Sequence, residues 1–127
     1  MSPRSAEFFD AARRRLEDAG ALLGRDPAAA LSLAYYAMLY AARAALSERD
    51  TYAKTHAGTW NLFQHEFVEG GSFDAAILAE ARNVQPERER ADYAAWQAPR
   101  EDAERVIQLA GRFIDAVGAL LGEGEPT

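Results

Sequence analysis

The segment PAAALSLAYYAMLYAARAAL, residues 27–46, decides the fold because only Ser32 and Arg43 interrupt its twenty otherwise apolar or aromatic positions. Its length also suits a membrane span. Much of the segment is alanine, however, and Arg43 inside a bilayer would cost about 2.5 kcal/mol or more. We therefore expect a helix that neighbouring helices enclose on several sides.

Amphipathic segments precede and follow this helix. In the first segment Phe8, Leu16 and Leu23 fall on one helical stripe, and the last segment, from about Pro99 to Leu121, has the most regular helical pattern of the chain. No segment alternates with the period of a strand. The connections of two to ten residues favour antiparallel neighbours. The sequence thus predicts an all-α fold: an up-and-down antiparallel four-helix bundle with an additional short or kinked helix.

Local signals predict where the helices begin. Asp26 before Pro27 caps the central helix, and Thr55 caps the next one. Ser72 is expected to cap a fourth helix, which Pro86 breaks or kinks.

Length and composition restrict the class of protein. The 127 residues suit a single helical domain, residues 1–127, with an ordered core of about 5–121. The net charge of −6 repels nucleic acid unless arginines cluster locally. The chain contains no cysteine, which excludes disulfides and thiol catalysis. With no signal-peptide pattern at the N-terminus, we expect a cytoplasmic protein.

Two places in the chain suit an anion such as phosphate. Lys54, Thr55 and His56 lie where a helix begins, and backbone N–H groups there favour negative charge. Alternatively, Thr55 only caps the helix. The second place, RNVQPERERADY, residues 82–93, is rich in arginine, whose forked guanidinium suits phosphates and carboxylates. Its alternative is a solvated face in which glutamates neutralise the arginines.

Arg43 must reach solvent, a carboxylate or a partner chain because an unpaired buried guanidinium is costly. Asp92 is the candidate partner, and such a pair either fastens two helices or belongs to a site. Tyr35, Tyr36 and Tyr40 are expected to pack in the core with hydroxyls at the rim. No metal-ligand spacing or glycine-rich phosphate loop is present, so we expect no cofactor and no metal.

Four motifs in this order, AYYAMLYAARAAL, KTHAG, LFQHEFVEGG and RERADY, precede the long last helix. With them the chain resembles the HEPN domain family, particularly its small single-domain prokaryotic members. The resemblance implies a homodimeric helical bundle, often paired with a small nucleotidyltransferase in toxin–antitoxin systems. Many members act as metal-independent ribonucleases whose active site lies across the dimer interface.

The family's catalytic signature is an arginine followed, after four to six residues, by a histidine. Here that signature is degenerate, because with four residues in between Arg88 is followed by Tyr93 and Arg82 by Glu87. Tyrosine, with a pKa of about 10, is a poor base at neutral pH. His56 has the right interval from Arg49 but lies elsewhere in the fold. It could still serve if a dimer brings it near Arg88.

Two functions therefore stay open at the level of the sequence, and with them whether the protein is an enzyme. The first is a toxin–antitoxin HEPN protein acting on RNA or nucleotides by a metal-independent ribonuclease-like mechanism at a dimer interface. The second is a non-catalytic nucleotide-binding or adaptor module that pairs with a nucleotidyltransferase; a purely structural dimer is a weaker third. The candidate catalytic residues are Arg88, His56 and Tyr93, and the candidate nucleotide- or phosphate-binding residues are Lys54, Thr55, Arg43 and Arg82.

Overall fold

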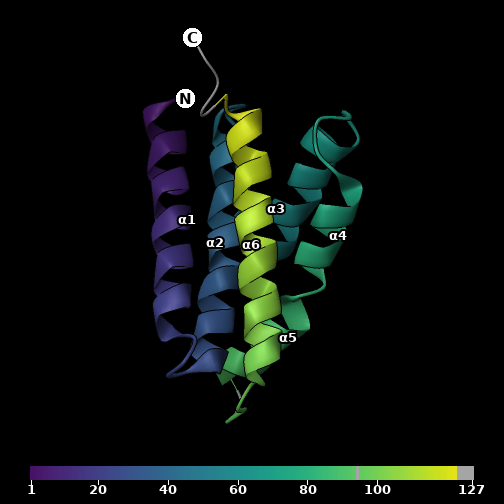
Figure 1. Ribbon diagram of the computed structural model, residues 1–127. Helices are drawn as coiled ribbons and strands as arrows, with labels where there is room; N and C mark the ends of the chain where they lie inside the picture. The colour runs from purple at the N-terminus through teal and green to yellow at the C-terminus, as the bar shows by residue number, and fades with distance from the viewer. Residues whose placement is uncertain (94, 123–127) are drawn as a thin grey trace.

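Helices make up the described chain apart from its connections. The computed structural model describes residues 1–93 and 95–122, and these ranges contain no strand. The elements are α1 (Pro3–Leu22), α2 (Pro27–Ser47), α3 (His56–Phe63), a π-helical turn η1 (Gln64–Val68), α4 (Ala75–Arg82), α5 (Gln85–Tyr93) and α6 (Arg100–Leu120) (Figure 1). The prediction of an all-α bundle is confirmed. The sequence predicts that the ordered core ends at about residue 121. Residues 123–127, in the tail beyond it, lie outside the described residues.

Side-chain caps start α2 and α3 where the sequence predicted them. The Asp26 carboxylate accepts the backbone N–H of Ala29, and the Thr55 hydroxyl accepts that of Gly58. Each bond satisfies a donor that the first turn of a helix otherwise leaves without a partner. Thr55 thereby sets the position of His56, the first residue of α3.

The fourth helix begins two residues later than predicted. Asp74, rather than Ser72, is its cap, because the Asp74 carboxylate accepts the backbone N–H of Ala76. The predicted interruption at Pro86 is confirmed: α4 ends at Arg82, and α5 starts at Gln85 with the proline in its first turn, where its missing N–H is not needed.

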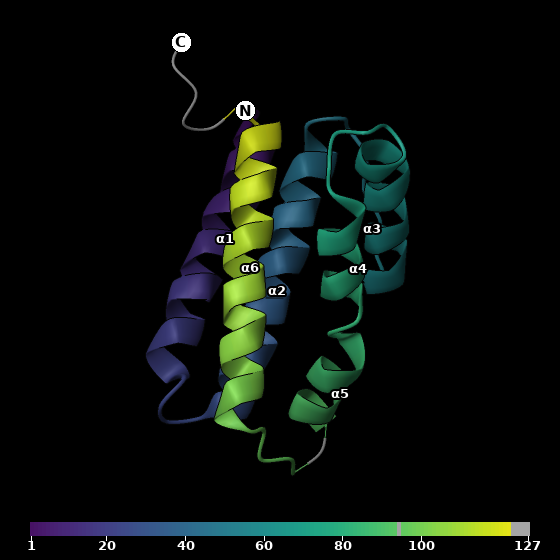
Figure 2. The same cartoon turned by 45° about the vertical axis from the view of Figure 1, so that its right-hand side comes forward.

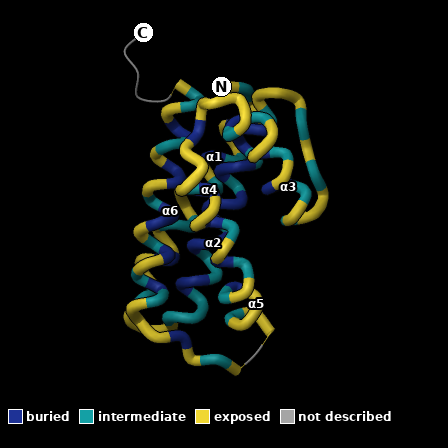
Figure 3. Tube along the Cα trace, turned by 90° about the vertical axis from the view of Figure 1, so that its right-hand side faces the viewer, coloured by how far each residue is buried: buried dark blue, intermediate teal, exposed yellow. Residues whose placement is uncertain are grey.

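Helix α2 is the centre of the bundle. It contacts α1, α3, α5 and α6, and the predicted enclosure by neighbouring helices is confirmed by its long run of buried positions (Figures 2 and 3). Among the described residues it is the one helix long and apolar enough to cross a membrane by length and composition, and 67% of that stretch is buried inside the protein. The side of α2 that carries Leu33, Tyr36 and Tyr40 is only partly covered.

The connection after α2 positions the site. His56 lies beside Tyr35 in the middle of α2, whereas Glu66 lies beside Arg49, just beyond its end. Residues 48–55 therefore return along the bundle, and α3 with η1 runs in the same direction as α2. This course places the N-terminus of α3 against the middle of α2 instead of at the end of the bundle.

Aromatic rings join α3, α6 and the segment before α4. Phe113 of α6 lies 5.9 Å from Trp60, 5.6 Å from Phe63 and 5.1 Å from Phe73, measured between ring centroids. Phe63 and Phe113 are fully buried. Trp60 also packs against Tyr35, whose ring contacts His56. This aromatic cluster therefore supports the surroundings of His56 from the interior of the bundle.

Truncation of the central ring should destabilise the protein strongly. Phe113→Ala should lower the free energy of unfolding by about 3–5 kcal/mol, since a buried ring is replaced by a cavity. Arg112→Ala, which removes an exposed partner of Glu80, should cost less than about 1 kcal/mol. Urea denaturation followed by circular dichroism measures both. Equal, small losses would contradict the central place given to Phe113.

Candidate functional site

Three helices bring five polar or aromatic side chains together, and His56 is one of the five. Tyr35 and Tyr36 come from α2, His56 from the first turn of α3, and Arg88 and Asp92 from α5; we call this group the His56 cluster. His56 Nδ1 lies 3.4 Å from the Tyr35 hydroxyl and 3.5 Å from Arg88 Nη2. At the level of the sequence, a role for His56 depends on a dimer that brings it near Arg88. A single chain already does so.

Arg88 is a nearly buried cation, with 5% of its surface exposed. Its guanidinium carbon lies 5.3 Å and 5.8 Å from the ring centroids of Tyr35 and Tyr36, and Nη1 donates to Asp92 Oδ2 at 3.0 Å. Burial works against its charge, but the bond to Asp92 and the neighbouring tyrosines outweigh burial and raise the pKa of Arg88. The guanidinium therefore remains charged and is held in one place.

Asp92 serves Arg88 rather than Arg43. Its carboxylate also accepts the Ser32 hydroxyl at 2.6 Å, so the prediction of an Arg43–Asp92 pair is wrong. Arg88 precedes Asp92 by one helical turn and reaches it within the same helix. The Arg43 guanidinium lies instead 5.9 Å from the ring centroid of Tyr52, at the edge of the cluster.

Two guanidinium N–H groups beside the cluster are buried without a partner. Within the described part of the chain, Nε of Arg43 and Nε of Arg88 have no hydrogen-bond acceptor. Buried donors left in this way are costly unless water or a ligand satisfies them. Both arginines also act electrostatically on His56.

Burial and nearby cations keep His56 uncharged at neutral pH. Burial lowers its pKa most, Arg88 and Arg43 lower it further, and Asp92 raises it. A neutral imidazole can accept a proton, as a general base must. Burial also raises the pKa of Tyr35 and of Tyr36, so both hydroxyls keep their protons near neutrality. Among the five side chains, His56 is thus the proton acceptor suited to neutral pH.

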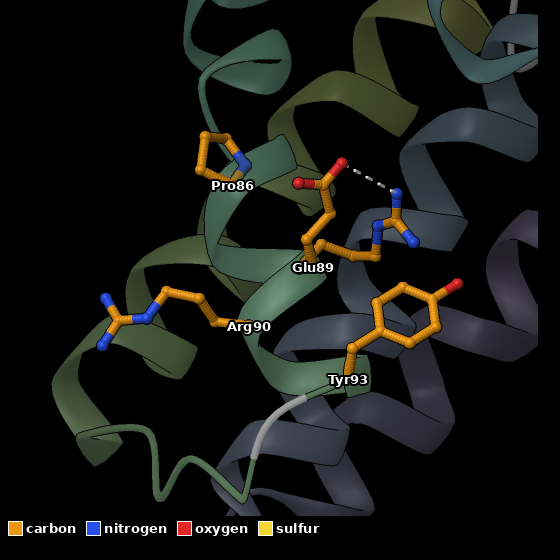
Figure 4. Close-up of a pocket in the computed structure, with 5 residues that line it drawn as sticks. Pro86, Glu89, Arg90 and Tyr93 are labelled. Atoms are coloured by element: carbon orange, nitrogen blue, oxygen red, sulfur yellow. Dashed lines mark ion pairs between the residues drawn. The ribbon is translucent and has the colours of Figure 1, made fainter.

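The predicted residues lie at different distances from the cluster. Lys54 and Thr55 are exposed and directly precede His56 in the chain. Tyr93 is 82% exposed and, with Arg88, lines an open concavity of about 580 Å³. Figure 4 shows Tyr93 and Glu89 directed to one side of α5 and Arg90 to the other.

Two predicted or considered arginines lie away from His56. Arg82 donates to the side-chain oxygens of Asn61 and Gln64 and lines a separate concavity between η1 and α4. Arg49 binds Glu66, so its permitted interval from His56 in the sequence has no counterpart in space. The binding role predicted for Arg82 would therefore belong to a second surface.

Sequence reasoning missed the residues that support the cluster from behind. Trp60 Nε1 donates to the Tyr35 hydroxyl at 3.1 Å, and that hydroxyl contacts Gln85 Oε1 at 2.5 Å. Neither residue belongs to a local motif, because each contributes through contacts with a helix at least 25 positions away. Among the described residues there is no group of three His, Cys, Asp or Glu side chains that could hold a metal ion.

These features define a class of protein: a small helical bundle in which a neutral histidine lies beside a buried arginine, and that arginine lines an open concavity. The HEPN domain family matches residues 4–120, and the chain belongs to this family. It is 32% identical over 74% of its length to "Putative toxin MJ0605" of Methanocaldococcus jannaschii, covering 70% of that protein. It is 29% identical over 97% of its length to "UPF0332 protein glr0978" of Gloeobacter violaceus, covering all of it. A second M. jannaschii protein, "Putative toxin MJ0142", is 28% identical over 68% of this chain and is covered over 59% of its own length.

The titration of His56 checks the electrostatics of the cluster. Arg88→Met should raise the pKa of His56, because it removes a cation and leaves Asp92 without its main partner. Arg112→Met, on the far side of α6 paired with Glu80, should leave it unchanged. NMR titration of the imidazole protons measures both. An unchanged or lower pKa of His56 in Arg88→Met would contradict the assignment.

The lowered pKa of His56 also predicts how stability depends on pH. In the native protein, the contribution of His56 to the free energy of unfolding should fall as pH drops below 6.5, because His56 then binds a proton more readily in the unfolded chain than in the folded one.

Proposed function

We propose that this HEPN protein is a toxin-type, metal-independent ribonuclease of the cytoplasm whose reaction centre is His56 and Arg88. One observation carries the proposal: a neutral, half-buried histidine lies 3.5 Å from a buried arginine that remains charged. The names of two relatives as toxins support the toxin-type role. The missing histidine of the family signature is thereby supplied from α3 instead of from α5.

The chemistry needs one proton acceptor and one phosphate ligand. The free ring nitrogen of His56 takes the proton of a ribose 2′-hydroxyl, whose oxygen attacks the adjacent phosphorus. A bond forms between this oxygen and phosphorus, and the bond from phosphorus to the 5′-oxygen breaks. The leaving oxygen takes a proton from water, which leaves a 2′,3′-cyclic phosphate and a 5′-hydroxyl end. Arg88 stabilises the charge that develops on the phosphate oxygens.

The neighbouring cations hold the phosphate. Among residues 1–93 and 95–122, Nε–H of Arg43 and of Arg88 have no hydrogen-bond acceptor, and Lys54 is an exposed cation next to the start of α3. Backbone N–H groups of that first turn, where Thr55 is the cap, add positive potential. Tyr93 stands at the rim of the concavity that Arg88 lines, within reach of the same bound strand.

A second copy of the chain covers the cluster in this proposal. Leu33, Tyr36, Tyr40 and Arg43 recur along α2 at steps of three and four and are only partly buried. This is the spacing of a seam between two helices, and tyrosine and arginine are enriched in protein interfaces. Because Tyr36 and Arg43 belong both to the seam and to the surroundings of His56, a homodimer across α2 would shield the reaction from water.

Histidine substitutions test the catalytic proposal. The purified protein should cleave single-stranded RNA in the presence of EDTA, and His56→Ala should lower the rate by at least about 100-fold, the range typical of a lost general base. His65→Ala is the matched control, since His65 is exposed and pairs only with Glu69 among the described residues. Intact RNA, together with saturable nucleotide binding that Arg88→Met abolishes, would contradict catalysis. That result would favour the non-catalytic module that pairs with a nucleotidyltransferase. The presence of Tyr93, where the family signature has its histidine, supports this alternative.

Sedimentation tests the dimer. The protein should sediment as a dimer at micromolar concentrations, and Tyr40→Glu should weaken association at least about tenfold by placing a charge in the seam. Gln108→Glu, at an exposed position of α6, is the control. A monomer at all of these concentrations would contradict the proposed interface, but it would not affect the His56 cluster, which lies within a single chain.

A further inference from the structure

The hydroxyl of Tyr35 contacts three polar side chains, and one of them is His56. The side chain is fully buried, and its hydroxyl lies 3.1 Å from Trp60 Nε1, 2.5 Å from Gln85 Oε1 and 3.4 Å from His56 Nδ1. A hydroxyl has one proton to donate and two lone pairs to accept with. Three neighbours therefore leave little freedom in how the hydrogen bonds are arranged.

The proton of this hydroxyl is committed to Gln85. The Gln85 amide nitrogen lies 3.1 Å from Glu89 Oε1, and an ionised carboxylate only accepts, so the NH₂ group must face Glu89. The amide oxygen then faces Tyr35 and can only accept. Trp60 can only donate and occupies one lone pair of the hydroxyl. What remains for His56 is a single lone pair on the Tyr35 oxygen.

A lone pair facing Nδ1 favours a proton on that nitrogen. Arg88 Nη2, at 3.5 Å, pulls the other way, because it would donate to an unprotonated Nδ1. At 3.5 Å this contact is at the long limit of a hydrogen bond, and Nη2 also lies within ion-pair distance of Glu89, at 3.9 Å, whereas Tyr35 has no second proton to offer. Arg43 and Asp92 are the other charges that act on the ring. A base at Nδ1 would also be enclosed between Tyr35 and Arg88, which lie 3.4 Å and 3.5 Å from it.

We propose that Tyr35 is a positioning residue that holds the proton of neutral His56 on Nδ1 and so leaves Nε2 as the base that faces substrate. None of the described residues hydrogen-bonds Nε2. The use of Nε2 as base rests on the proposed ribonuclease function, whereas the position of the proton does not. Burial of Tyr35 raises its pKa, which keeps the hydroxyl protonated and the arrangement constant across the pH range of assay.

Gln85→Met gives the sharper test because it removes the acceptor and keeps the side-chain length. The freed Tyr35 proton should then turn to His56 Nδ1 and shift the imidazole to the tautomer with its proton on Nε2. Nitrogen-15 chemical shifts of histidine-labelled protein at pH 8, assigned with His65→Ala, should report Nδ1–H in the native protein and Nε2–H in Gln85→Met. Gln108→Met, at an exposed position of α6, is the control and should keep Nδ1–H.

Single-turnover cleavage of RNA gives the functional readout. Gln85→Met and Tyr35→Phe should each lower the cleavage rate at least about tenfold, while the Kd for RNA changes less than about twofold. An Nε2–H tautomer in the native protein overturns the positioning role even where RNA is cleaved. An Nδ1–H tautomer that persists in Gln85→Met overturns it too. Intact RNA with the expected tautomers in both proteins refutes the ribonuclease and leaves the positioning role standing.

Discussion

The structure depends on covering α2. A helix that is apolar on most of its surface gains stability only where other elements exclude water from it. α1 and α6 cover its length, and α3 and α5 cover part of another side. The remaining strip, with Leu33, Tyr36 and Tyr40, is only partly covered, and in the proposed function it belongs both to the surroundings of the site and to the dimer interface.

Arg88 shows how a charge is kept inside such a bundle. Removing a guanidinium from water is costly unless a carboxylate and further hydrogen bonds replace the lost solvation. Asp92 supplies the carboxylate from one turn along the same helix, and two tyrosine rings cover the faces of the cation. The arrangement leaves Arg88 little freedom to move, which the proposed role as a phosphate ligand requires.

The net charge of the protein repels anions, whereas the arginines near His56 attract them. The net charge is −6, yet Arg88 and Arg43 both act on one histidine, and Lys54 lies two residues before it in the chain. A long polyanion gains little from the bulk field of such a protein, so binding would rely on local contacts with one or two phosphates. In the proposed function, this balance suits action at one position of an RNA strand better than the coating of a nucleic acid.

The sequence by itself determined the class of fold, because the apolar run of residues 27–46, the caps Asp26 and Thr55, and the break at Pro86 act within a few residues of chain. It also marked His56 and Arg88 as candidates by residue type and by the resemblance of their motifs to a family. Only the tertiary structure decided which groups meet. The return of residues 48–55 along the bundle carries His56 to Arg88. Asp92 pairs with Arg88, one turn away in α5, instead of with Arg43, and Arg82 pairs with Asn61 on another face. These pairings span between 4 and 32 positions of sequence, and the side-chain geometry that selects among them exists only once the helices have packed.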